Sequence, residues 1–400
     1  MRVTVAGLAA LGAIGATSLI AGQAGAGADP RRPCALERTA AHHSEGVSTW
    51  NSAYPRPARS LRAVMVFLSF PDSEPLTTPG ELAADHFPGT AGYYQRASYG
   101  RFRLRVDPQR RWIRMPHAST SYRIERDWAP DKRARYLRDA ISAADPKTDF
   151  SKYDVVYLVA DPDAPGVDSD ATKVVNFDQP LVADGTPLRR IVTVFEQHPP
   201  DRNVLAHETG HVFDLPDLYH RPNDGKGDWD TYVGDWDLMG SQFGLAPELF
   251  AWHKWRLGWI RDRQVDCIRK SGTSGHVLEP LEQPPAAGMP RSARLVVVPT
   301  GRSSAVAIEA RSRYGNDAHI CREGVLVYRV HSSTESGSGP IQVLDGHPHT
   351  GACWDRSVYP SLADAPLGVG DSLTSKKDGV RVTVTGRDPA GRWRVQVDRR

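Results

Sequence analysis

The clearest pattern along the chain is a series of short apolar runs that indicate buried strands. Residues 61–70 are almost continuously apolar, as is typical of a strand that is buried on both faces. Residues 153–160 and 190–195 repeat this signature. Residues 130–144, which lie between the first and second of these runs, place their apolar side chains along one helical face. Strands that alternate with a helix predict a mixed sheet with crossover helices.

Helical periodicity disappears after about Arg261, where short strand-like runs separated by turn residues take over. These runs are residues 294–298, 305–310, 324–330, 380–385 and 392–397. The last two alternate apolar and polar residues, which puts the apolar side chains on one face of each strand. The pattern therefore predicts an α+β protein that ends in a separate all-β domain, for which we expect a sandwich. Residues 332–370 carry no assignable pattern.

Length and composition describe an ordinary globular protein. The 400 residues suit one large domain or two medium ones, and 40% hydrophobic with 24% charged residues excludes a disordered or collagen-like chain. The formal net charge of +3 provides no electrostatic reason to expect a polyanionic partner. We therefore do not expect nucleic-acid binding.

The N-terminus has the features of a secretory signal peptide. An uncharged, largely apolar stretch covers residues 3–21, and small residues at Ala24, Ala26 and Ala28 suit signal peptidase. The alternative is a membrane anchor, but a bilayer span needs about 20 strongly apolar residues and this stretch is diluted with Gly, Ala and Thr. We expect residues 1–28 to be removed, with cleavage after Ala28.

The next segment, residues 29–60, is polar and contains four prolines, and we interpret it as a surface arm. Whether this arm is removed on activation stays open. Export predicts a secreted, extracellular protein without stable membrane association.

The four cysteines agree with export. Cys34, Cys267, Cys321 and Cys353 are an even number at wide spacing without a Cys-x-x-Cys pair, which favours two disulfides over a thiolate metal site. Three connectivities exist. We favour Cys321 with Cys353, because both lie in the C-terminal region and close a modest loop, and this leaves Cys34 to pair with Cys267.

The sequence His-Glu-Thr-Gly-His at residues 207–211 predicts a metal site on a short helix. Asp201 can cap this helix, and Pro216 ends it. At 3.6 residues per turn, His207, Glu208 and His211 share one side of the helix. The alternative is a surface helix with two solvated histidines.

A catalytic zinc takes three protein ligands and keeps its fourth position for water, so a third ligand must follow. Asp217 lies six residues after His211, just past the residue that stops the helix, and a chain that turns back there brings its carboxylate to the metal. Zinc lowers the pKa of its water to about 7. Glu208 can then accept the proton as this water attacks a peptide carbonyl.

Two later segments are rich in tryptophan and glycine. Residues 234–241 read Gly-Asp-Trp-Asp-Leu-Met-Gly-Ser, and Pro247 and Gly258 bracket an expected helix of about ten residues. Taken alone, these segments indicate core packing.

Together with the histidine motif, however, they resemble the immune inhibitor A-like family of secreted bacterial metalloproteases. The segments that carry this resemblance are residues 207–219, 234–241 and 247–259, with further similarity at 70–72, 93–100 and 324–328. The resemblance covers about residues 62–262 and continues more weakly toward the C-terminus.

The resemblance implies a zincin-type catalytic domain over residues 61–262, followed by the β domain at 263–400. It implies zinc on His207, His211 and Asp217, Glu208 as the general base, and Met239 in a methionine-containing turn beneath the metal. Calcium is also common in such proteases. The candidate calcium ligands are Asp224, Asp228 and Asp230, although a solvated acidic loop is the alternative interpretation.

One residue departs from the family pattern, which usually has glycine where this chain has Asp214. Aspartate is among the few other residues that tolerate the left-handed conformation, so we expect the turn to survive. The carboxylate of Asp214 can also compete for the metal, and Glu248 is the substitute third ligand. Tyr219 and Tyr232 are candidate hydrogen-bond donors to the oxyanion, with core packing as the alternative for both.

We therefore expect a monomeric, secreted zinc endopeptidase that acts on protein or peptide substrates. The alternatives are a non-catalytic exported binding protein on a protease scaffold and a zinc amidase that acts on cell-wall peptides. Residue order does not define the cleavage specificity or the physiological substrate.

Overall fold

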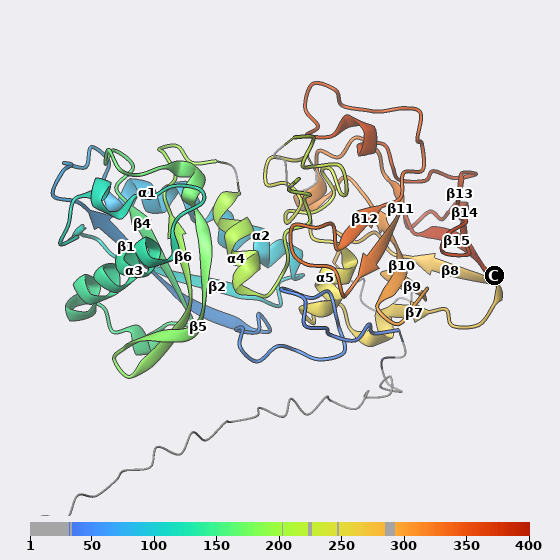
Figure 1. Ribbon diagram of the computed structural model, residues 1–400. Coiled ribbons are helices and arrows are strands. Elements are labelled where there is room, and N and C mark those ends of the chain that lie inside the picture. The colour runs from blue at the N-terminus through green and yellow to red at the C-terminus, as the bar shows by residue number, and fades with distance from the viewer. Residues whose placement is uncertain (1–31, 33, 202, 223–225, 246–247, 285–292) are drawn as a thin grey trace, which may run out of the picture.

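The computed structural model describes residue 32 and residues 34–400, apart from 202, 223–225, 246–247 and 285–292. The expected signal peptide at residues 1–28 lies outside this part of the chain. The described residues form a mixed α+β structure with three sheets and few helices, as Figure 1 shows.

The first sheet has the strand order β2-β1-β4-β6-β5, and the short β3 pairs with the end of β1. Its strands are β1 (Ser60–Ser69), β2 (Arg103–Pro108), β3 (Ile113–Arg114), β4 (Val155–Ala160), β5 (Lys173–Ala183) and β6 (Thr186–Val194). All neighbours are parallel except β5, which runs antiparallel to β6 at the edge. The expected mixed sheet is therefore present, and its central strands β1 and β4 are buried on both faces.

Helices cover both faces of this sheet. They are α1 (Pro79–His86), α2 (Gly89–Ala97), α3 (Pro130–Ala144) and α4 (Val204–Val212). The bounds of α3 are those predicted, and its buried residues share a core with Val64, Val66 and Leu68 of β1. The other three helices pack on the opposite face, against Met65 and Phe67. This arrangement places α4 between the sheet and the C-terminal half (Figure 1).

The C-terminal half contains two further sheets, with the orders β12-β11-β10-β9-β7 and β13-β14-β15-β8. Their strands are β7 (Val265–Cys267), β8 (Gly272–Leu278), β9 (Leu295–Pro299), β10 (Ser304–Arg311), β11 (Gly324–His331), β12 (Ile341–Val343), β13 (Ser372–Ser375), β14 (Val380–Arg387) and β15 (Trp393–Arg399). All five strand-like runs of the sequence are strands here. The alternating apolar residues of β14 and β15 are buried and share one core with β9, β10 and β11.

Short 3₁₀ helices connect these elements. They are Ser119–Tyr122, Asp145–Lys147, Phe150–Lys152, Ser169–Ala171, Asp262–Gln264, Gly315–Asp317 and Pro360–Leu362.

The core does not divide at residue 262, where the sequence suggested a domain boundary. Helix α5 (Ala251–Arg256) is shorter than the ten residues expected, and all six of its residues are buried. One cluster of buried side chains joins α5 and the first sheet to β9, β10 and β11. A helix that is buried all round needs cover on every side, so both halves of the chain contribute to it.

Residues 34–47 are not a surface arm, which corrects the interpretation of this segment. Cys34, Leu36 and Val47 are buried hydrophobic residues, and His43 and Glu45 are buried polar residues. The segment passes through the interior because charged partners from distant parts of the chain satisfy its polar groups.

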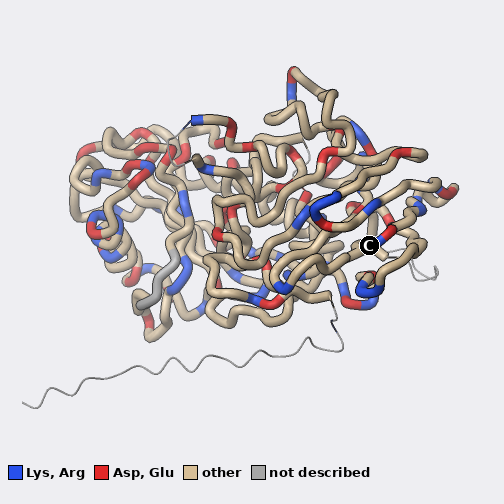
Figure 2. The backbone as a smooth tube through the Cα atoms, turned by 45° about the vertical axis from the view of Figure 1, so that its right-hand side comes forward, with Lys and Arg blue, Asp and Glu red and all other residues tan. Residues whose placement is uncertain are grey.

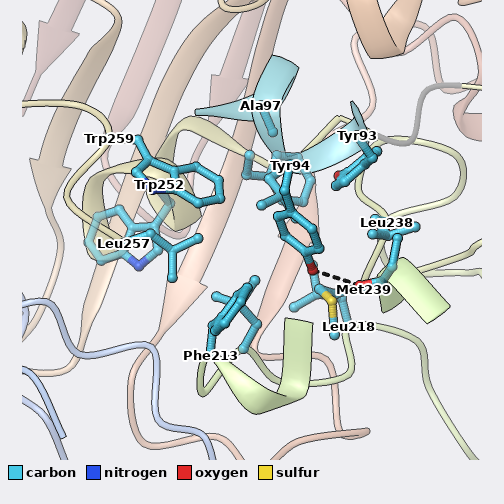
Figure 3. Close-up of a cluster of buried hydrophobic side chains, with 14 of the residues drawn as sticks. Tyr93, Tyr94, Ala97, Phe213, Leu218, Leu238, Met239, Trp252, Leu257 and Trp259 are labelled. Atoms are coloured by element: carbon cyan, nitrogen blue, oxygen red, sulfur yellow. Dashed lines mark hydrogen bonds between the residues drawn. The ribbon is translucent and has the colours of Figure 1, made fainter. Parts of the chain in front are cut away.

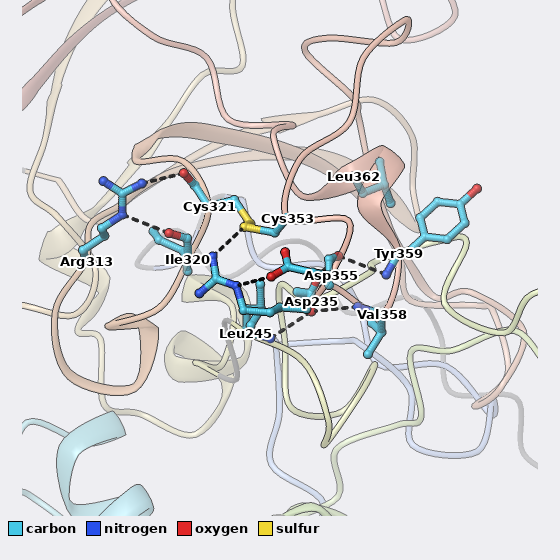
Figure 4. Close-up of a disulfide and its surroundings, with 12 residues drawn as sticks. Asp235, Leu245, Arg313, Ile320, Cys321, Cys353, Asp355, Val358, Tyr359 and Leu362 are labelled. Atoms are coloured by element: carbon cyan, nitrogen blue, oxygen red, sulfur yellow. Dashed lines mark hydrogen bonds and ion pairs between the residues drawn. A yellow bond between two sulfur atoms is a disulfide. The ribbon is translucent and has the colours of Figure 1, made fainter.

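Both disulfides have the connectivity that we favoured. Cys34 pairs with Cys267 at a Cα–Cα distance of 5.6 Å, and Cys321 pairs with Cys353 at 6.1 Å. Near the second disulfide, Arg313 donates hydrogen bonds to the carbonyl oxygens of Ile320 and Cys321 (Figure 4). Two disulfides are typical of an oxidising, extracellular-type environment.

Within the described residues, no helix has the length and apolar character that a membrane span requires. Basic and acidic positions are interspersed along the whole backbone, as Figure 2 shows.

His253 on α5 lies at the centre of a buried ionic cluster. Its Nε2 is 2.8 Å from Oε1 of Glu45, and its Nδ1 is 3.0 Å from Oδ2 of Asp237. Burial alone would lower the pKa of His253, but the two carboxylates outweigh burial and raise this pKa to about 10. The protonated imidazole therefore ties the N-terminal segment to α5 and to the loop that contains Met239.

This cluster predicts that stability falls as the pH rises. The folded-state pKa of His253 is raised to about 10 from 6.5, so its contribution is complete below pH 6.5 and is lost as the pH rises toward 10. We expect the free energy of unfolding to drop by an amount on the order of a few kcal/mol between these limits. Guanidinium denaturation at pH 6 and pH 9.5 measures this difference.

The variant His253→Asn should be less stable overall and should lose most of this pH dependence. The matched control is His276→Asn. His276 lies on the partly exposed strand β8 and also pairs with a carboxylate, that of Asp266. If His253→Asn keeps the wild-type pH dependence, the charged state assigned to His253 is wrong.

Candidate metal centre

Helix α4 carries the histidine motif and is buried along its whole length. It begins after Asn203, whose φ of +59° is left-handed, and it has no side-chain cap. The expected cap by Asp201 is therefore wrong. Its backbone amide instead donates to Oε2 of Glu196 at 3.1 Å, because Asp201 lies outside the helix beyond the left-handed residue.

The structure brings together the three residues expected as metal ligands. Ligand atoms of His207, His211 and Asp217 all lie within 4.8 Å of one another. Oδ1 of Asp217 is 3.3 Å from Nε2 of His207 and 3.0 Å from Nε2 of His211. Such a set of two imidazole nitrogens and one carboxylate suits a catalytic zinc site.

Backbone carbonyls orient both imidazoles. Nδ1 of His207 donates to the carbonyl of Leu238 at 2.9 Å, and Nδ1 of His211 donates to the carbonyl of Leu215 at 2.8 Å. These bonds leave each Nε2 free to bind a cation, as in protein metal sites where the second ring nitrogen is hydrogen-bonded.

Two observations show that the site fits a cation. Oδ1 of Asp217 is buried and accepts no hydrogen bond of normal geometry from the described residues. Burial would raise the pKa of Asp217, but His211 and His207 hold it well below its usual value. For His211, burial would lower the pKa, yet the charge of Asp217 outweighs burial and raises it to about 9. The carboxylate therefore requires a positive charge beside it, which a divalent ion can supply in place of the proton.

Glu208 lies beside this cluster on the same helix. Its Oε2 accepts a hydrogen bond from the backbone amide of Val174, on the edge strand β5, at 2.7 Å. Burial raises the pKa of Glu208 above the usual carboxyl range. A carboxylate with a raised pKa next to a metal site is a better proton acceptor than an ordinary glutamate.

The cluster opens onto two adjoining cavities. One has a volume of about 380 Å³ and the other about 300 Å³, and both are lined by His207, Glu208, Tyr219 and Trp229. The shared lining makes them neighbouring parts of one cleft, and Glu208 borders both parts. Lys173 and neighbouring residues at the start of β5 form one border of this cleft.

Met239 packs against α4 at Gly210, and Figure 3 shows it beside the end of this helix that carries Phe213. It is fully buried, and its carbonyl accepts a hydrogen bond from the amide of Leu218 at 2.9 Å. A Cβ atom at Gly210 would collide with Sδ of Met239. Any larger residue between Thr209 and His211 would therefore require the side chain of Met239 to move.

The chain turns sharply after α4 and carries Asp217 back toward the histidines. The amide of Asp214 donates to the carbonyl of His211 at 3.0 Å, and the amide of Leu215 donates to the carbonyl of Gly210 at 3.1 Å. These two bonds are those of a Schellman motif. Asp214 occupies its left-handed position with φ of +67°, as the sequence predicted.

Asp214 does not compete for the metal. Its carboxylate is fully buried and pairs with Arg38, His43 and Arg256. Burial would raise its pKa, but the hydrogen bond from His43 and the two guanidinium charges lower this pKa to about 2. The substitute ligand Glu248 also lies elsewhere, with its Oε2 3.2 Å from Nζ of Lys254.

The two candidate oxyanion donors differ in position. Tyr219 lines both cavities, and burial together with the charges of Asp217 and Glu208 raises its pKa, so its hydroxyl keeps its proton. Tyr232 is not among the described residues that line either cavity, and its ring packs against His220 at 5.1 Å. Only Tyr219 is placed to donate to a group in the cleft.

The calcium site stays a prediction. Asp224 lies outside the described residues. Asp228 accepts a hydrogen bond from the amide of Asp230 at 2.9 Å, and burial raises the pKa of Asp230 to about 7. In the part of the chain that the structure describes, the histidine and Asp217 cluster alone gathers three ligand atoms.

Several cleft residues were not identified from the sequence. They are His42, His43, Arg126, Lys173, Arg221, Trp229 and Ser336. No spacing in the sequence links His42 and His43 to the histidine motif, which begins more than 160 residues later. Only the tertiary fold brings them to the metal ligands.

A scan of protein-family models finds none that matches this chain, and a search of curated proteins finds no similar sequence.

Proposed function

We propose that the chain is a secreted zinc-dependent endopeptidase with Glu208 as its general base. The observation that carries this proposal is the meeting of His207, His211 and Asp217 at one point beside a buried glutamate in an open cleft. Two imidazoles and a carboxylate with a free coordination position are the donor set of catalytic zinc sites.

The residues of the chain have distinct roles in this reaction. His207, His211 and Asp217 would hold the zinc, which when bound would supply Lewis-acid polarisation of the scissile carbonyl and a lower pKa for the attacking water. Glu208 accepts the proton of that water and delivers it to the leaving amine, while the amide of Val174 holds its carboxylate in place. The hydroxyl of Tyr219 donates a hydrogen bond to the oxyanion that develops on the carbonyl.

The cleft favours an extended peptide as the substrate. It consists of two neighbouring cavities that share Glu208 in their lining, which provides room for substrate residues beyond the scissile bond. The edge strand β5 borders it, and an open strand edge can pair with an extended segment through main-chain hydrogen bonds.

The finer fold assignment belongs to the same proposal. We assign a zincin-like fold to residues 61–262, on the basis of the mixed sheet, the active-site helix α4 and the methionine turn. The shared core of the two C-terminal sheets supports a sandwich. Secretion through a signal peptide at residues 1–28 is supported by the two disulfides.

We predict that Glu208→Gln abolishes peptide hydrolysis but not metal binding. Losing a positioned general base should reduce kcat by about 10²–10⁴-fold. The purified variant should keep about one equivalent of zinc, because Glu208 is not a ligand. Casein digestion and zinc content measure these two properties.

The matched control is Glu196→Gln, since Glu196 is a buried carboxylate that lines the same cleft. It should retain most of the activity. Wild-type protein that binds zinc but cleaves no peptide would favour the binding-protein alternative. Activity confined to cell-wall peptides would favour the amidase alternative.

We also predict that Asp217→Ala loses zinc. Removing a ligand should weaken zinc binding by more than the roughly 10–100-fold that loss of an outer partner costs. Glu248→Gln should bind zinc as the wild type does, because Glu248 pairs with Lys254 instead. Chelator competition measures both affinities, and the opposite result would make Glu248 the third ligand.

A further inference from the structure

The turn after α4 contains a residue whose backbone conformation is costly for it. Asp214 has a φ of +67°, a region that is unfavourable for residues with a Cβ atom and natural for glycine. Aspartate tolerates this conformation but does not prefer it. Its side chain must therefore provide something that glycine cannot.

The carboxylate of Asp214 joins three parts of the chain. Oδ2 lies 2.6 Å from Nη1 of Arg38 and 2.8 Å from Nη2 of Arg256, which is on α5. Oδ1 accepts a hydrogen bond from Nδ1 of His43 at 2.8 Å. Two of these three partners come from the N-terminal segment, residues 34–47.

The same segment also touches a metal ligand. The ring of His43 stacks on the ring of His211, with centroids 5.7 Å apart and planes 24° from parallel. His43 is 3% exposed, so this contact lies inside the protein. The segment thus holds both the imidazole of His211 and the turn that leads to Asp217.

Further contacts fix the segment in the fold. Glu45 pairs with His253 at 2.8 Å, and its carbonyl accepts a hydrogen bond from the indole of Trp252 at 3.0 Å. Ser44 donates to the carbonyl of Ser332 at 2.6 Å. Cys34 is bonded to Cys267. Because all of these contacts would have to break for the segment to leave, we do not expect it to be released on activation.

We propose that residues 34–47 are a permanent part of the metal centre, in which Arg38 and His43 act as positioning residues that set the affinity for zinc. They act through the carboxylate of Asp214 and the ring of His211. This inference rests on the proposed zinc site. It also implies that any activating cleavage which releases the preceding residues lies on the N-terminal side of Cys34.

The test measures zinc affinity in variants of the full mature chain. Arg38→Met removes one charged partner of Asp214, and His43→Leu removes both the hydrogen bond and the ring stacking. Each should weaken zinc binding by about 10–100-fold, the usual cost of losing an outer partner of a metal ligand. The milder variant Arg38→Lys keeps the charge and should recover most of the zinc affinity. It therefore keeps the test valid if Arg38→Met does not fold.

The control is Arg32→Met, because Arg32 pairs with Asp262 at 2.8 Å and donates to the carbonyl of Val47 at the end of the segment, but pairs with neither Asp214 nor His211. It should bind zinc with wild-type affinity. The visible absorption spectrum of the cobalt-substituted protein should change in Arg38→Met and His43→Leu, since it reports the geometry of the ligands. It should not change in Arg32→Met.

The proposal is overturned if both variants keep the wild-type zinc affinity and cobalt spectrum and show only a lower Tm of the metal-free protein. The segment would then have a purely structural role. Peptide hydrolysis is measured separately. If the variants lose zinc affinity as expected but the wild-type protein hydrolyses no peptide, this inference stands and the endopeptidase proposal fails. A wild-type protein that binds no zinc overturns both.

Discussion

The structure depends on the placement of one carboxylate, that of Asp217, whose buried Oδ1 lies against two imidazole nitrogens. An unpaired charge inside a protein is strongly unfavourable, so this carboxylate can remain there only with a cation beside it. The distances of 3.0 Å and 3.3 Å to the two Nε2 atoms leave a common point for such a cation. The buried helix, the left-handed turn and the methionine turn all keep these three side chains together.

Periodicity and spacing predicted the parts of the molecule that are determined locally. The continuous apolar run of β1 and the one-sided pattern of α3 follow from burial of their side chains. Helices α1 and α2 were missed because few apolar residues mark their buried sides. The position of Asp217 beside the two histidines was predicted because the chain was expected to turn back soon after the helix. The cap at Asp201 was predicted wrongly because a left-handed Asn203 comes between it and α4.

The N-terminal segment shows why the remaining features were out of reach. Its polar composition suggests exposure, yet His43 and Glu45 are buried because their partners lie at Asp214 and His253. These pairs are separated by 171 and 208 residues. A single sequence does not reveal which distant charge will satisfy a polar residue. The continuity of the core across residue 262 was hidden for the same reason, since α5 is covered by strands that follow it in the chain.

The link between Cys34 and Cys267 changes what a cut in the exposed stretch between Ser48 and Arg59 would do. Such a nick would produce two polypeptides, but the shorter one would stay covalently joined to the longer one. Its buried polar and apolar contacts would also remain in place. The product would be a two-chain molecule, recognisable on a gel only after reduction.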